Sequence, residues 1–406
     1  MLVPLPLLVP LVLSPETPDN GRVELVESWP IETDLDHPDI PDAHEVWLEM
    51  IDGAEHSLEF GEFYCSNKSG SRLEPIVKAI ERAAERGVHV RWLAEEKFYK
   101  TYPETLDRID AKEGIEVRRF DVSQSMGGVL HAKYFLVDER EAFIGSQNFD
   151  WRALEHIQEL GVRVISRELV APLRTMFDQD WTLAEGGEPD YSAFPHRAAA
   201  PAKDSHDDFA VTTLVKEGSC EVELALSPKS WVLPHTWDLP EILERIDDAE
   251  HTVRIQLLTY KTKARDGSHF GDLDDALRAA AKRGVKVELL IADWSKRESS
   301  LKALKSLQRV DGIDVRFVCV PAWSGGHVPY GRVVHAKYMV VDGERTWIGT
   351  SNWERGYFHQ SRNMGLVIDG APFAKQLERF FATGWTSDYA EPLDPDAEYT
   401  PPRIGD

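Results

Sequence analysis

The sequence is poor in cysteine and has no long apolar segment. Its 406 residues include only three cysteines, Cys65, Cys220 and Cys319, and none belongs to a CxxC pair or a Cys/His cluster. We therefore expect no structural metal; one disulfide at most could form, and the spacing does not decide whether it does. No stretch approaches the ~20 consecutive apolar residues that a transmembrane helix needs. We expect no stable membrane insertion.

Positive charge is also scarce. The chain has 46 Lys and Arg against 70 Asp and Glu, which gives a net charge of −24. A field of that sign repels phosphate backbones, so loose coating of a nucleic acid duplex is not expected. It remains compatible with solubility and with an enzyme that holds one phosphate in a locally basic pocket. The 42% hydrophobic and 29% charged residues are typical of a globular protein.

Residues 1–20 form an apolar leader that allows two interpretations. The run Leu2–Leu13 resembles the core of a secretory signal, but three prolines interrupt it and no basic residue precedes it. If the leader is a signal remnant, the protein is secreted or periplasmic. If it is a disordered or packed segment, the protein is cytoplasmic.

An internal repeat decides the domain organisation. HAKYFLVD begins at His131 and HAKYMVVD at His335, 204 residues later, and GSQN and GTSN follow at the same offset. Upstream, IDGAEHSLEF matches IDDAEHTVRI, and AERGVHVRWL matches AKRGVKVELL. We predict a first half over residues 21–197, a linker over 198–218, a second half over 219–391 and a loose, proline-rich tail over 392–406.

Each half shows the same alternation of helix and strand patterns. Apolar periodicity predicts helices at 45–51 and 73–86, and at 242–246 and 273–283 of the second half. Short β-branched runs predict strands at 57–63, 88–93, 252–259 and 285–291, and at both copies of the repeated motif. The fold class is therefore α/β, with a mixed or parallel sheet flanked by helices in each of two pseudo-symmetric halves.

The repeated motif places histidine and lysine side chains together. Residues two apart in a strand point to one face, so His131 projects with Lys133 and His335 with Lys337. Ammonium groups can bind the non-bridging oxygens of a phosphate, and the amides of Asn148 and Asn352 can donate further hydrogen bonds. The lysines supply the positive charge, so we expect neither a metal nor another cofactor.

HxKxxxxD followed by G[ST]xN, present twice, resembles the signature of the phospholipase D superfamily. HAKYFLVDEREAFIGSQNFDWRALEHIQELGV and PYGRVVHAKYMVVDGERTWIGTSNWERGYF look like the phospholipase D3/D4-type 5'→3' single-strand exonucleases. The resemblance implies two halves with one shared site and a metal-independent phosphodiesterase with a phosphohistidine intermediate. It implies single-stranded DNA or RNA as the substrate, with a phospholipase D or phosphatidyl transferase acting on phospholipid headgroups as the alternative. Either a monomer or a homodimer would be compatible.

The resemblance also suggests how the two histidines divide the work. In the superfamily the residue 28 positions after the motif histidine bonds a catalytic imidazole; here it is Glu159 after His131 and Asn363 after His335. A carboxylate partner favours the imidazolium form, which suits a general acid, whereas an amide leaves the ring neutral. Assuming that each partner serves its own half, we predict His335 as the nucleophile and His131 as the general acid and base.

Other residues near the motifs have two readings each. Asp138 and Asp342 suit strand-end turns or salt bridges better than chemistry. Ser146 and Thr350 could contact phosphate or pack in tight turns. Aromatic residues could line the substrate site or belong to the core: they are Tyr64, Trp151 and Trp353.

Overall fold

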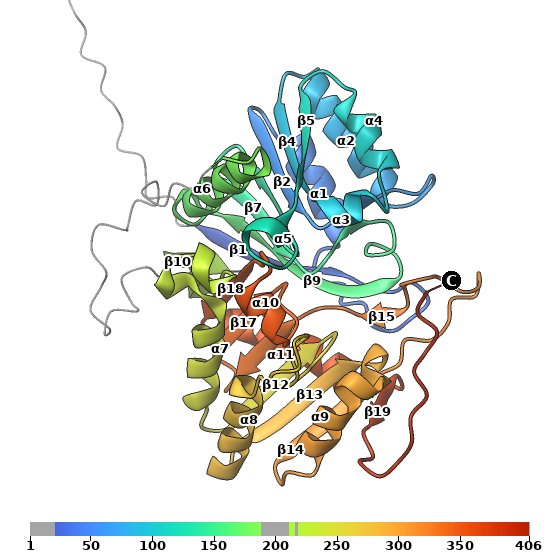
Figure 1. Cartoon of the computed structure of the whole chain (residues 1–406), viewed down its shortest axis with the longest axis vertical. Coiled ribbons are helices and arrows are strands. Elements are labelled where there is room, and N and C mark those ends of the chain that lie inside the picture. Colours follow the sequence, from blue (N-terminus) through green and yellow to red (C-terminus); the bar gives the residue numbers. More distant parts are fainter. Residues whose placement is uncertain (1–20, 188–210, 216–217, 406) are drawn as a thin grey trace, which may run out of the picture.

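The computed structural model describes residues 21–187, 211–215 and 218–405; the predicted leader 1–20 and most of the predicted linker lie outside these ranges. Figure 1 shows two halves of similar build stacked along the longest axis, the first in blue to green and the second in yellow to red. Each half holds a sheet with helices against it, which confirms the predicted α/β fold class.

The described part of the first half alternates strands and helices in the predicted order. Its elements are β1 (Arg22–Ser28), α1 (Ala43–Asp52), β2 (Ser57–Glu62), β3 (Cys65–Ser66), α2 (Leu73–Glu85), β4 (His89–Glu95), α3 (Glu96–Tyr99), α4 (Glu104–Asp110), β5 (Ile115–Phe120), α5 (Val122–Ser125), β6 (Lys133–Val137), β7 (Glu141–Gly145), β8 (Phe149–Asp150), β9 (Ile157–Ile165) and α6 (Arg167–Ala184).

The second half repeats this order. Its elements are β10 (Val211–Val215), β11 (Gly218–Leu224), α7 (Asp238–Asp247), β12 (Thr252–Leu257), α8 (Asp272–Arg283), β13 (Lys286–Ala292), α9 (Glu298–Gln308), β14 (Ile313–Val318), β15 (Val333–Val334), β16 (Tyr338–Val341), β17 (Arg345–Gly349), α10 (Arg355–His359), β18 (Gly365–Asp369), α11 (Ala371–Thr386) and β19 (Ala390–Pro392).

The repeated helices end where the sequence predicts. Helix α2 buries one apolar stripe against the sheet, and its chain turns at Gly87, whose φ is 95°. Helix α8 ends the same way at Gly284, with φ of 97°. Glycine adopts this left-handed conformation without a Cβ clash, so both helices stop and lead directly into the next strand.

The strands of both halves form one continuous ladder. Its order is β5-β4-β2-β6-β7-β9-β1 in the first half and β10-β11-β18-β17-β16-β12-β13-β14-β19 in the second. The halves join where β1 and β10 pair in parallel at Arg22 and Leu214. Strands β2, β4 and β5 are parallel, and so are β12, β13 and β14; the motif strands β6 and β16 run antiparallel to β2 and β12. The sheets are therefore mixed.

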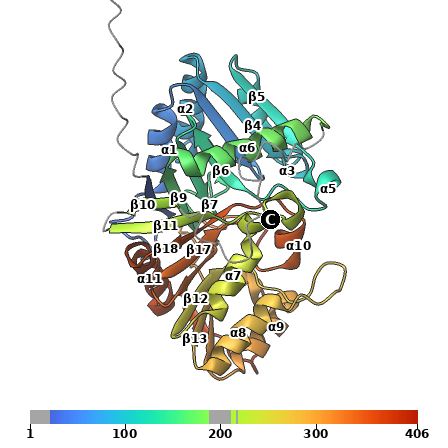
Figure 2. The same ribbon diagram turned by 90° about the vertical axis from the view of Figure 1, so that its left-hand side faces the viewer.

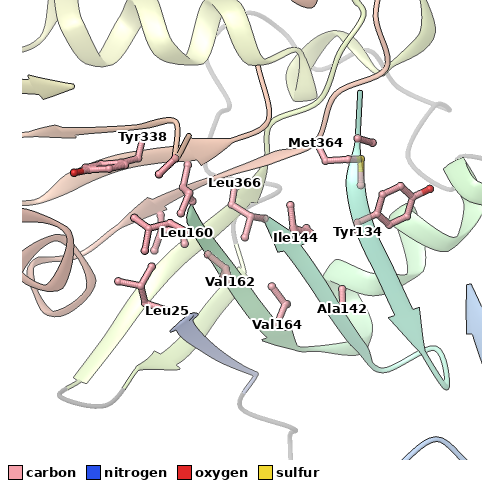
Figure 3. Close-up of a cluster of buried hydrophobic side chains, with 14 of the residues drawn as sticks. Leu25, Tyr134, Ala142, Ile144, Leu160, Val162, Val164, Tyr338, Met364 and Leu366 are labelled. Atoms are coloured by element: carbon pink, nitrogen blue, oxygen red, sulfur yellow. The ribbon is translucent and has the colours of Figure 1, made fainter. Parts of the chain in front are cut away.

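Three apolar clusters hold the layers together. One lies under α1 and α2 of the first half, and its counterpart lies under α7 and α8 of the second. The third fills the space between the halves, where α6 and α11 contribute Phe177 and Phe380. Figure 3 shows part of it, with Leu160 of the first half near Leu366 of the second and Tyr134 of the first half near Met364 of the second. The two halves thus share a core and cannot separate without exposing it.

Two boundary predictions were wrong. Val211–Val215 was assigned to a linker but forms strand β10, because it pairs with β11 and continues the ladder. The tail after 392 is packed rather than loose: Leu393 is buried, Tyr399 lies edge-on to Phe317, and the carbonyl of Ile404 accepts a hydrogen bond from the backbone of Tyr330.

Described helices include none that is both long and apolar enough to cross a membrane. Cys65, Cys220 and Cys319 are all free thiols, which answers the disulfide question that the spacing left open.

A buried ion pair ties the halves together. Arg362, which precedes β18, donates to both carboxylate oxygens of Asp180 in α6, at 2.8 and 2.7 Å, and both side chains are 1% exposed. The same guanidinium donates to the carbonyls of Ser227 and Trp231. The buried guanidinium of Arg362 thus has a counter-ion and carbonyl acceptors around it, and a buried ion is tolerated under this condition.

We predict that Asp180→Asn lowers the free energy of unfolding by about 3 kcal/mol, because it leaves a buried guanidinium without its counter-ion. Asp178→Asn, on the same helix but about half exposed, should cost well under about 1 kcal/mol. Urea denaturation of both variants measures the difference, and equal losses would contradict the role given to the pair.

Candidate active site

The two motif histidines are held by the opposite half. The backbone N–H of His131 donates to the carbonyl of Arg362 at 2.9 Å, and that of His335 donates to the carbonyl of Gln158 at 2.8 Å. Strand β15, which leads into His335, pairs in parallel with β9 of the first half. Each motif is therefore hydrogen-bonded to the other half at the junction, and these bonds bring the repeated residues of both halves together.

The imidazoles are paired across the junction as well. Nδ1 of His131 donates to Oδ1 of Asn363 at 3.0 Å, and Nδ1 of His335 donates to Oε2 of Glu159 at 2.7 Å. The assumption that each partner serves its own half was wrong, because Glu159 on β9 and Asn363, two residues before β18, each bond the imidazole of the other half. In both rings Nδ1 is occupied by its partner, so Nε2 is the nitrogen left to meet a substrate.

Ser146 and Thr350 support these partners. Thr350 Oγ1 donates to Asn363 Oδ1 at 3.0 Å and accepts from the N–H of Met364. Ser146 Oγ donates to the carbonyl of Leu160 and accepts from its N–H, at 3.2 and 3.1 Å, beside Glu159. Both hydroxyls are fully buried in these turns. The sequence left phosphate contact and tight-turn packing open for Ser146 and Thr350, and the structure shows both hydroxyls hydrogen-bonded within the turns.

The lysines are buried next to their histidines. Lys133 Nζ donates to the carbonyl of His131 at 2.7 Å, and Lys337 Nζ donates to that of His335 at 2.6 Å. An ammonium has three N–H donors, so each lysine keeps hydrogen atoms for a phosphate. Asn148 and Asn352 follow the next strands, and the Oδ1 of each is buried without a hydrogen-bond partner.

Burial and mutual repulsion shape the protonation of the cluster. Burial lowers the pKa of His131 and His335 well below the usual value, and the charges of Lys133 and Lys337 lower both further. Burial lowers the pKa of Lys337 to about 7 and raises that of Glu159 to about 8. A phosphodiester anion placed among these groups reverses the penalty, because it favours every cationic form around it. The site is thus built to take up a negative charge.

Asp138 and Asp342 have the strand-end role that the sequence favoured. The carboxylate of Asp138 accepts the backbone N–H groups of Glu55, His56 and Ser57 at 2.7 to 2.9 Å. Asp342 accepts those of Glu250, His251 and Thr252 over the same distances. These bonds fasten the far end of each motif strand to the turn before β2 or β12, away from the imidazoles.

The predicted aromatic residues separate into two groups. Trp353 is 1% exposed and packs against Tyr260 and Trp347, so it belongs to the core and not to a substrate site. Trp151 is half-buried, with the ammonium of Lys68 4.1 Å from its ring centre. Tyr64 donates to Asp150 at 2.7 Å and is also half-buried.

Two rings that the sequence did not single out flank His131. Phe63 lies 5.1 Å from its ring centre and Tyr357 lies 4.8 Å away, both edge-on. The repeat could not identify them, because the aligned positions hold Leu258 and Ala153. The sequence offered one signal for these two rings, their closeness to predicted site residues: Phe63 is next to Tyr64, and Tyr357 lies five residues after Asn352. The surroundings of the two histidines are therefore unequal.

Within the described ranges, no group of three or more His, Cys, Asp or Glu residues is arranged to hold a metal ion. The positive charge around the histidines comes from the two lysines.

Comparison with known proteins agrees with this geometry. The family model described as "Cardiolipin synthase, PLD-like domain" matches residues 47–181 and 242–385. Phospholipase D Z of Dictyostelium discoideum is 32% identical, over 92% of this chain and 91% of its own length. The human 5'-3' exonuclease PLD3 is 30% identical, over 94% of this chain and 82% of its own length.

A solved structure shares the fold. The phosphatidylserine synthase of Haemophilus influenzae superposes with a TM-score of 0.60 at 14% identity, over 86% of this chain and 85% of that one. Two histidines with lysine neighbours, meeting across duplicated α/β halves, define a phosphodiesterase. The chain belongs to the phospholipase D superfamily.

We predict opposite pH effects from exchanging the two imidazole partners. Glu159→Gln removes the carboxylate that favours protonated His335, so the alkaline limb of the kcat/KM profile should move to lower pH and kcat should fall about 100-fold. Asn363→Asp gives His131 a carboxylate, so the acidic limb should move to higher pH. Profiles from pH 4 to 9 measure both shifts, and unchanged limbs in both variants would refute the pairing's electrostatic role.

Proposed function

We propose that this phosphodiesterase is a metal-independent 5'→3' exonuclease acting on single-stranded DNA or RNA. Relatives named exonuclease and relatives named phospholipase D are about equally similar, at 30% and 32% identity. Sequence similarity therefore does not choose between nucleic acid and phospholipid. The observation that carries the choice is the positive charge around α10, the helix whose Tyr357 contacts His131.

Basic side chains gather around α10, the helix that presents Tyr357 to His131. Arg265 is close enough to Tyr357 to act on its pKa, which burial raises to about 12. Burial lowers the pKa of His359, and the nearby charges of Arg355 and Lys229 lower it further. In a chain of net charge −24, Arg265, Arg355 and Lys229 bring three positive charges to this helix, where Glu354 and Asp272 are the acidic neighbours.

The cations favour a polyanionic substrate. A nucleic acid strand carries further phosphates beside the one being cleaved, and each can meet one of these side chains. Phosphatidylcholine has one phosphate, which the lysines of the site already bind, and a quaternary ammonium that Arg265 and Arg355 repel. The balance supports a nucleic acid strand as the substrate.

The reaction proceeds in two steps with His131 as the nucleophile. Its partner is an amide, which leaves the ring neutral, whereas the ionised form of Glu159 favours protonated His335. Because burial raises the pKa of Glu159 to about 8, this ionised form becomes more populated as the pH rises. This assignment reverses the sequence-based one, which rested on the same argument but on pairing within each half. The effect of an amide or a carboxylate on an imidazole is the same in both assignments, but each partner bonds the histidine of the other half, so the roles of the two histidines are exchanged.

In the first step Nε2 of His131 attacks phosphorus and forms a P–N bond while the P–O bond to the leaving group breaks. Protonated His335 gives its Nε2 proton to the departing oxygen. In the second step neutral His335 takes a proton from water, whose oxygen attacks phosphorus and releases His131. Lys133, Lys337, Asn148 and Asn352 hold the non-bridging oxygens throughout. One chain supplies every group, so the mechanism requires no second copy.

We predict that a single-stranded oligonucleotide, labelled at its 3' end, is shortened from its 5' end to mononucleotides in the presence of EDTA. Phosphatidylcholine vesicles should yield no choline under the same conditions. The lysines and not a metal neutralise the phosphate, so EDTA should leave the rate unchanged. Choline release without nucleotide release would replace the proposal with a phospholipase D, and loss of activity in EDTA would refute the metal-free mechanism.

We further predict that acid or rapid-quench trapping of the intermediate places the phosphoryl group on the peptide that contains His131. His335→Asn should accumulate this adduct on a substrate with a good leaving group, because the second step lacks its base. His131→Asn should form none. Adduct on His335 in the unmodified enzyme would overturn the assignment of roles.

A further inference from the structure

We propose that four aromatic side chains of the first half, Phe63, Tyr64, Phe98 and Tyr102, form a platform on which bases of the bound strand stack. We call this cluster the aromatic platform. The inference rests on the proposed nucleic acid substrate and adds a binding site for the bases next to the cleaved phosphate. Its residues lie outside the duplicated motifs.

The platform starts at the catalytic histidine and leads away from it. Phe63 meets His131 edge-on at 5.1 Å and Phe98 at 3.9 Å between ring centres. Tyr64 lies nearly parallel to Phe98 at 6.0 Å and to Tyr102 at 4.9 Å, with interplanar angles of 23° and 27°. Contact passes from ring to ring without a break, so a strand leaving the phosphate site meets aromatic side chains.

The platform is placed where ligands bind in open α/β sheets. Phe63 and Tyr64 directly follow β2, and Phe98 and Tyr102 follow β4, both at the carboxyl ends of parallel strands. In Figures 1 and 2, α3 of the first half and α10 of the second border the junction that holds the histidines. All four platform side chains are half-buried, unlike the core rings Trp92 and Phe60, which are fully buried.

Cations accompany the rings. Lys97 and Lys100 are exposed and alternate with the aromatic residues in the sequence KFYKTY. The guanidinium of Arg152 lies 5.6 Å from the ring centre of Tyr102, and the ammonium of Lys133 lies 4.8 Å from that of Phe63. Flat rings with interspersed positive charges suit a strand whose bases stack while its phosphates meet the cations.

The second half has no equivalent. After β13 the chain reads DWSKRESS where the first half reads EKFYKTYP after β4, and Leu258 replaces Phe63. A platform on one side of a pseudo-symmetric site gives the strand a single direction of entry. Exonucleolytic cleavage from one end requires this kind of asymmetry, which the symmetric catalytic groups do not provide.

The test removes the rings but keeps the apolar volume. Phe98→Leu/Tyr102→Leu should raise KM for a single-stranded oligonucleotide about tenfold, since stacking on one ring is worth roughly one decade or more in affinity, and leave kcat nearly unchanged. On an oligonucleotide with abasic residues at its first two 5' positions, the variant and the unmodified enzyme should have equal KM values. Thermal unfolding confirms that the variant is folded.

Tyr99→Leu is the matched control. Tyr99 is on the same helix as Phe98, α3, but its ring packs against the core of the first half and lies beside Arg119. We expect its KM values on both oligonucleotides to equal those of the unmodified enzyme.

The outcomes separate the two proposals. An unchanged KM of Phe98→Leu/Tyr102→Leu on the normal oligonucleotide, or an equal rise on the abasic one, would overturn the platform while leaving the exonuclease proposal standing. If the unmodified enzyme cleaves neither oligonucleotide but releases choline from phosphatidylcholine vesicles, both proposals fail.

Discussion

The exchange of hydrogen bonds across the junction is the constraint on which the site depends. His131 takes its backbone acceptor from Arg362 and its ring partner from Asn363, while His335 takes them from Gln158 and Glu159. Neither half can orient its own imidazole, because the partner strand lies in the other half. The shared apolar core and the Arg362–Asp180 pair hold the two halves in a fixed relative position. A change that destabilises the junction therefore also disturbs the geometry of the site.

Burial of like charges is the second organising effect. Two lysines and two imidazoles in one buried cluster oppose each other's protonation, and among the described residues the one acidic side chain bonded to either imidazole is Glu159, whose own pKa burial raises to about 8. Such a cluster is costly until an anion enters it. The negative charge of a bound phosphodiester compensates this cost. The same attraction between the anion and the cationic groups both binds the phosphodiester and keeps the acidic imidazole protonated when the P–O bond breaks.

Symmetry of the catalytic groups contrasts with asymmetry around them. The repeated His and Lys residues occupy equivalent positions in the two halves, yet His131 is flanked by Phe63 and Tyr357, and basic residues lie near α10. Chemistry at phosphorus needs the symmetric part. We propose that the choice of substrate and the direction of cleavage depend on the loops after β2, β4 and β17, where the sequences of the two halves differ. Acidic net charge is compatible with a polyanionic substrate because the cations are local.

The sequence alone determined the duplicated α/β halves, the repeated His, Lys and Asn residues to which we assign the chemistry, and the turn role of Asp138 and Asp342, since these follow from local pattern and from repetition at a fixed offset. It did not reveal that Glu159 serves His335 and Asn363 serves His131, because hydrogen bonds between residues 176 or 232 positions apart leave no local pattern. Likewise, the burial of Trp353, strand β10 within the expected linker and the ring of Phe63 against His131 depend on which surfaces meet. Periodicity specifies which face of an element is apolar, but only the packed structure decides what that face contacts.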